Sequence, residues 1–166
     1  MYQTIQEFIE DWKLESEYTL KLFRAMNDAS LKQQVYEEGR SLGRVAWHIT
    51  YTIAEMMGHS GLEMGNEVEE DEVPTMAKTM VKSYEQLSLA LVEQLRAQWT
   101  DAMLQEAIEL YGEMWDRSKV LDVLIRHQAH HRGQMTVLMR QAGRRVPGIY
   151  GPAREEWAEM DLQPRP

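Results

Sequence analysis

The placement of proline constrains the fold of this chain more than any other feature of its sequence. Prolines occur at positions 74, 147, 152, 164 and 166, so the first 146 residues contain a single proline, Pro74. A proline inside a helix removes a backbone hydrogen bond, and its ring clashes with the preceding turn. Sandwiches and barrels of short strands instead need frequent turns rich in proline and glycine. The sequence therefore favours long helices and disfavours a turn-rich β architecture.

Apolar residues recur at spacings of three and four along four segments, which is the period of an amphipathic helix. We predict helices over residues 4–28, 41–57, 74–99 and 118–143. We predict brief helical pieces at 100–110 and 153–160, a loop at 58–73 and a connector at 111–117. No segment shows the alternation of a strand. The predicted fold is all-α, a four-helix bundle with a short C-terminal helix, in a single domain over residues 1–166.

The net charge of the chain limits the kinds of partner that it can bind. Eighteen Lys and Arg residues against 27 Asp and Glu residues give a formal net charge of −9. Such a surface repels nucleic-acid phosphates and anionic membrane surfaces, so we expect no nucleic acid and no membrane as a partner. The N-terminus lacks the basic and apolar regions of a signal peptide, and no apolar run approaches the roughly 20 residues of a spanning helix. We therefore expect a cytoplasmic protein.

The histidines are the strongest candidates for a functional site. The chain has no cysteine, so any metal site must consist of imidazoles and carboxylates. His127 and His131 are four residues apart in the run HQAHHRGQM, so on a helix they lie on one face about a turn apart. His48 lies on the apolar stripe of the second predicted helix, which in a bundle can face the fourth. The sequence therefore indicates a metal site with His48, His127 and His131 as ligands.

Other interpretations of these histidines compete with the metal site. A histidine on an apolar stripe is more often a hydrogen-bonded core residue, and H-x-x-x-H is common by chance. Three buried imidazoles without partners would, however, leave polar nitrogens unsatisfied at about 1–3 kcal/mol each, and a cation removes that cost. Zinc-peptidase chemistry is disfavoured, because H-E-x-x-H needs a glutamate where this chain has Gln128. We expect His130 to point elsewhere and His59 to lie in the solvated acidic loop.

Three segments carry a resemblance to a known family: AWHIT at 46–50, HQAHHRGQM at 127–135 and PGIYGPAREEW at 147–157. On these segments the chain resembles the DinB/YfiT-like superfamily, over essentially its whole length and in the same helix order. The resemblance implies a four-helix bundle with up-down-down-up connectivity. It also implies one divalent metal ion per chain, held by His48, His127 and His131, and a two-fold homodimer.

The resemblance suggests two classes of function. Characterised relatives include transferases and isomerases that use low-molecular-weight thiols such as bacillithiol, and hydrolase-like metal proteins. The first expectation is therefore a metal-dependent enzyme, of thiol S-transferase or hydrolase type, whose metal activates an exogenous thiol or water toward a small-molecule substrate. Gln128 and Tyr51 are candidates for lining its pocket. The alternative is a non-catalytic metal-binding protein, a stress-associated structural or interaction protein in which the ion holds the second helix against the fourth. We expect Zn or Ni as the metal, with Fe, Mn or Cu as alternatives.

Overall fold

The computed structural model describes residues 1–65, 68–161 and 163 of the chain. None of the helices in these residues is both long and apolar enough to cross a membrane. The described elements are, in chain order, α1 (Ile5–Ala25), the 3-10 helix η1 (Asp28–Lys32), α2 (Leu42–His59), α3 (Ala77–Gln98), the 3-10 helix η2 (Asp101–Gln105), strands β1 (Ala107–Leu110) and β2 (Glu113–Asp116), α4 (Arg117–Gln141), and the 3-10 helix η3 (Arg154–Met160).

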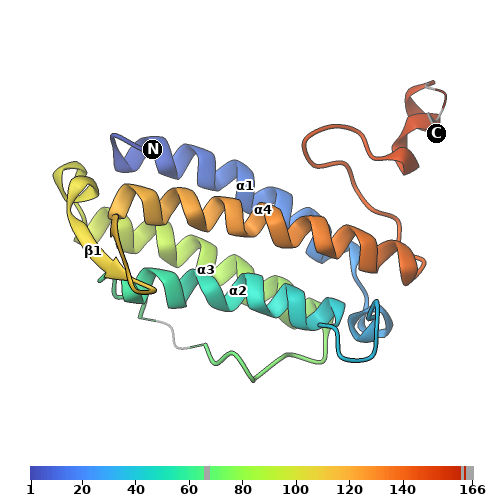
Figure 1. Cartoon of the computed structure of the whole chain (residues 1–166). Helices are drawn as coiled ribbons and strands as arrows, with labels where there is room; N and C mark the ends of the chain where they lie inside the picture. Colours follow the sequence, from blue (N-terminus) through green and yellow to red (C-terminus); the bar gives the residue numbers. More distant parts are fainter. Residues whose placement is uncertain (66–67, 162, 164–166) are drawn as a thin grey trace.

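The four α-helices form an up-down-down-up bundle. Helices α1 and α4 run in one direction along its axis, and α2 and α3 run in the other (Figure 1). Helix α1 packs against α3 and α4, and α2 packs against the same two helices. The parallel helices α2 and α3 are joined by a long crossover, residues 60–76, whose described parts run along the outside of the bundle (Figure 1). The fold class predicted from the sequence is confirmed.

Buried aromatic rings form the centre of the bundle. Phe8 and Trp12 of α1 stack with their ring centroids 5.9 Å apart, and Phe23 packs against Tyr84 of α3 at 5.1 Å. These four side chains are almost completely inaccessible to solvent. Burying a large apolar side chain contributes about 1.5–3 kcal/mol, so this core stabilises the bundle along its whole length.

Polar caps set the ends of the helices. Helix α1 begins with a capping box, in which Thr4 accepts a hydrogen bond from the Glu7 amide and the Glu7 carboxylate accepts one from the Thr4 amide, each 3.2 Å long. Helix α3 begins at Ala77 rather than at the predicted Pro74. Its first amide donates to the Asp28 carboxylate at 2.8 Å. A contact from a distant segment therefore fixes this helix start, which local sequence could not show.

The helical piece predicted at 100–110 is present only as η2, and the segment after it forms a β-hairpin instead of the rest of that piece and the predicted connector. Strands β1 and β2 pair antiparallel across the two-residue turn Tyr111–Gly112. Both turn residues have positive φ, 52° and 79°, as a type I′ hairpin requires. The hydroxyl of Tyr111 donates to the Glu55 carboxylate of α2 at 2.8 Å. The prediction was wrong because four-residue strands are too short to show alternation, and because a contact with α2 holds the tyrosine in the turn.

The C-terminal segment leaves the end of α4 and carries a short helix, as predicted. Helix η3 spans Arg154–Met160, against a predicted 153–160, and is a 3-10 helix. None of its residues is buried. Its side chains form exposed ion pairs with the end of the bundle, such as that of Glu155 with Arg140 at 2.8 Å. It therefore adds little to the core.

Gly133 offers a test of helix propensity in α4. It is exposed in the interior of the helix, and a Cβ at this position would meet no atom within 4 Å. Gly133→Ala is expected to raise the free energy of unfolding by about 0.5–1 kcal/mol, because alanine loses less backbone entropy on folding. Gly143→Ala should have the opposite effect, because Gly143 has a φ of 68°. Urea unfolding measures both, and a destabilised Gly133→Ala variant would contradict the prediction.

Candidate metal centre

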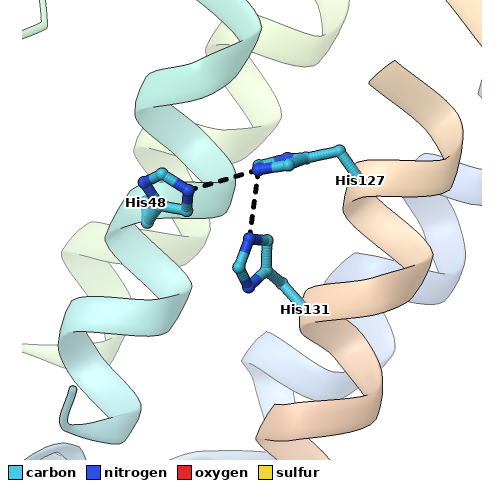
Figure 2. A group of neighbouring side chains, drawn as sticks. All are labelled: His48, His127 and His131. Atoms are coloured by element: carbon cyan, nitrogen blue, oxygen red, sulfur yellow. Dashed lines mark hydrogen bonds between the residues drawn. The ribbon is translucent and has the colours of Figure 1, made fainter. Parts of the chain in front are cut away.

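The antiparallel neighbours α2 and α4 bring three histidines together. His48 projects from α2 toward His127 and His131, which project from successive turns of α4 (Figure 2). The Nε2 atom of His127 lies 3.2 Å from Nε2 of His48 and 3.0 Å from Nε2 of His131. We call these residues the three-histidine cluster. The structure thus places the three predicted ligands side by side.

A buried glutamine aligns the two helices at this level. The Gln128 amide nitrogen donates to the Ile49 carbonyl of α2 at 2.9 Å. Its oxygen accepts hydrogen bonds from the Tyr84 hydroxyl at 2.9 Å and from the Thr19 hydroxyl at 3.3 Å. Gln128 and Ile49 are each next in sequence to a cluster histidine. Gln128 is fully buried in the core, so the prediction that it lines a pocket is wrong.

Burial keeps the cluster uncharged. It lowers the pKa of His48 to about 4 and that of His127 to about 3, and it lowers the pKa of His131 as well. The Arg40 guanidinium, just before α2, contributes to the lowered pKa of each ring. The hydrogen bond with Gln134 raises the pKa of His131 and so opposes part of this decrease. The imidazoles are therefore neutral near pH 7, the protonation state in which they bind metals.

The spacing of the cluster fits a divalent cation. Zinc–nitrogen bonds of about 2.0–2.1 Å in tetrahedral geometry place ligand nitrogens about 3.3 Å apart. The Nε2 separations of 3.2 and 3.0 Å are close to this value. One nitrogen from each ring lies within 4.8 Å of the other two, and within the described residues no carboxylate or further imidazole joins the group. Three protein ligands would leave coordination positions open to water or a substrate.

The other predicted residues lie outside the cluster. His130 is exposed on α4, with its Nε2 atom 3.1 Å from the Gln134 amide nitrogen. His59 is exposed at the end of α2, 3.4 Å from the Glu55 carboxylate. Neither residue belongs to the cluster, but the prediction that His59 lies in the acidic loop is wrong, because α2 continues to His59. Tyr51 is partly exposed on α2, and burial together with nearby carboxylates raises its pKa.

Three further side chains lie at the cluster rings and were not singled out from the sequence. Each places an oxygen atom near the Nδ1 atom of a different ring: Thr52 at 3.4 Å from His127, Glu70 at 3.6 Å from His48, and Gln134 at 2.8 Å from His131. Thr52 and Gln134 lie one helical turn from a cluster histidine, so helical spacing could have found them. Glu70 lies in the crossover, where no local pattern indicates its position.

Comparison with known proteins gives a consistent set of relatives. A sequence model of the DinB family matches residues 1–165. The Bacillus subtilis strain 168 protein YrdA, which is described as uncharacterized, is 46% identical over 163 residues, and the match covers 98% of each chain. These relatives resemble the chain over nearly its full length.

Solved structures agree with this result. The crystal structure of a DinB-like protein from Bacillus cereus ATCC 10987 matches with a TM-score of 0.86 and 45% identity, covering 90% of this chain and 100% of that one. That of the DinB-like protein YjoA from Bacillus subtilis matches with a TM-score of 0.69 and 19% identity, covering 89% and 99%. The second likeness concerns the fold alone.

Proposed function

Because the chain belongs to the DinB family, we propose that its three-histidine cluster holds one divalent metal ion and that the protein is a metal-dependent enzyme. We further propose that it uses a low-molecular-weight thiol, or water, to attack a small electrophilic substrate. Zn or Ni is the proposed ion, because three neutral imidazoles suit both.

The convergence of the three Nε2 atoms carries this proposal. Nitrogens at 3.0 and 3.2 Å from a common neighbour are positioned as ligands of a single ion. The absence of a fourth ligand among the described residues supports a catalytic over a purely structural ion, because structural zinc sites are normally saturated by protein side chains.

The surroundings of the cluster also suit anionic nucleophiles. A bound divalent cation would supply a Lewis acid that lowers the pKa of a thiol or of water toward neutrality. The chain has no cysteine, so the sulfur of any thiol chemistry must come with a cosubstrate. The Arg40 guanidinium acts on all three rings, and its positive charge favours the anionic form of a group that enters the site.

Metal content and thiol-dependent turnover test the proposal. Protein purified without chelator is expected to contain about one divalent ion per chain by elemental analysis, and His131→Ala is expected to lose it. The control is His59→Ala, which removes an exposed histidine and should retain the ion.

Thiol-dependent turnover of a model electrophile should disappear in His131→Ala and persist in His59→Ala. A wild-type protein that neither contains nor takes up metal contradicts the site, and equal turnover in both variants contradicts the enzyme.

A further inference from the structure

The oxygen atoms beside the three-histidine cluster point to a second role for residues outside it. We infer that Thr52, Glu70 and Gln134 are positioning residues that hold the hydrogen of each imidazole on Nδ1 and so leave each Nε2 lone pair free for the metal. We call these three residues the ring partners. The inference rests on the proposed metal site and adds to it the groups that orient its ligands.

The clearest case is Thr52, because the backbone carbonyls of His48 and Ile49 lie closer to its hydroxyl than the imidazole does. Its hydroxyl donates to the backbone carbonyl of His48, one turn earlier in α2, at 2.8 Å. Its only hydrogen is then used, so toward Nδ1 of His127, 3.4 Å away, the oxygen can act only as an acceptor. Nδ1 of His127 therefore carries the hydrogen, and its Nε2 presents a lone pair.

A chain of two contacts orients His131 in the same way. Nδ1 of His131 lies 2.8 Å from the Gln134 oxygen. The amide nitrogen of Gln134 lies 3.1 Å from Nε2 of His130. An amide nitrogen only donates, so the contact with His130 turns the amide oxygen toward His131, where it accepts. This arrangement gives His130 a function that its position outside the cluster did not suggest.

The third ring partner comes from the crossover between α2 and α3. Nδ1 of His48 is buried, and among the described residues it has no hydrogen-bond partner; the Glu70 carboxylate lies 3.6 Å from it. Two side chains of α2 hold this part of the crossover in place. Arg44 donates to the Glu70 carbonyl at 2.6 Å, and Trp47 donates to the Glu69 carbonyl at 2.9 Å. A carboxylate has no hydrogen of its own to offer, so its oxygen at 3.6 Å favours the tautomer of His48 that carries the hydrogen on Nδ1.

The three assignments of the imidazole hydrogens together explain how a cation fits among the Nε2 atoms. If each hydrogen is on Nδ1, the Nε2 atoms face one another at 3.0 and 3.2 Å with lone pairs and no hydrogen between them. Such an arrangement is repulsive unless a cation lies among the nitrogens. Acceptors at the far side of metal-bound imidazoles fix the ring orientation and raise the basicity of the ligand, and their loss typically weakens metal binding 10–100-fold.

Conservative variants of Thr52 and Gln134 test the inference. Zinc affinity is measured by competition with a chromogenic chelator, and the visible absorption of bound Co²⁺ reports the ligand geometry. Thr52→Val and Gln134→Met should each weaken zinc binding about 10–100-fold and change the Co²⁺ spectrum. Gln134→Glu, which keeps an acceptor, should retain the affinity. Thr50→Val is the matched control, because Thr50 donates to the Ala46 carbonyl one turn earlier but shares no hydrogen bond with a cluster ring.

A charge-matched pair tests the contribution of the crossover. Glu70→Met and Glu69→Met each remove one carboxylate from neighbouring positions, but only Glu70 places its carboxylate at His48. The larger loss of zinc affinity is expected for Glu70→Met, because methionine offers the ring no oxygen acceptor. If the wild type binds zinc and the variants of all three ring partners match their controls within about twofold, the inference is overturned while the metal site stands. A wild-type protein that binds no zinc overturns the metal site itself.

Discussion

Replacing Arg132 with methionine is expected to lower the free energy of unfolding by about 3–5 kcal/mol. Arg132 of α4 is 3% exposed. Its guanidinium donates to the Glu15 carbonyl at 2.9 Å, to the Thr19 hydroxyl at 3.0 Å, and to the Glu15 carboxylate and the Tyr150 hydroxyl. Methionine would leave the Glu15 carboxylate without its counter-ion in a largely buried position. Urea unfolding of the metal-free protein measures the change without a contribution from metal binding.

Two further variants separate the buried pair from a general effect of losing an arginine. Arg140, also on α4, pairs with Glu155 at 2.8 Å, and the two side chains are 46% and 24% exposed. Arg140→Met should therefore lower the free energy of unfolding by less than about 1 kcal/mol. The double variant Arg132→Met with Glu15→Gln should recover part of the stability, because no unpaired charge then remains buried. An Arg132→Met variant no less stable than Arg140→Met would show that the buried pair does not stabilise the bundle.

The sequence predicted the bundle because its four long helices carry a regular apolar stripe. It failed where distant contacts decide the local structure. Helix α3 begins at Ala77 because the Ala77 amide donates a hydrogen bond to Asp28. Tyr111 adopts a positive φ in the hairpin turn, where its hydroxyl donates to Glu55 of α2. Neither partner is close in sequence. A prediction based on local pattern therefore locates the helices well, but it locates the helix ends and the short strands poorly.

The same division applies to the candidate site. The spacing of His127 and His131 predicted that they lie on one face of a helix. The position of His48 on the apolar stripe of the second helix predicted that it faces them. Gln128 is a core residue rather than a pocket residue, because its amide joins α4 to α2, α3 and α1 through Ile49, Tyr84 and Thr19. Glu70 could not be found, because only the folded crossover brings it to His48.

The metal-free protein is expected to stay folded, and zinc at about 1,000 times its Kd should raise the free energy of unfolding by about 4 kcal/mol. The first expectation follows from the aromatic core, in which Phe23 packs against Tyr84 and the Trp12 indole donates to the Ser88 carbonyl, so that α1 and α3 are joined without the histidines. The second follows from mass action, because the unfolded chain does not hold three imidazoles together. For a domain of this size the increase corresponds to a rise in Tm of roughly 8–16 °C.

Circular dichroism and thermal unfolding, with and without chelator, measure both effects. The chelated protein should keep its helical spectrum at 25 °C, and zinc should raise the Tm of the wild type but not that of His127→Ala. This pattern supports an ion that acts on a substrate, because the fold exists without it. A chain that loses its helical spectrum in chelator would contradict the prediction. Metal binding would then supply the free energy of folding, as in a structural site. The non-catalytic function would become the better account of the three histidines.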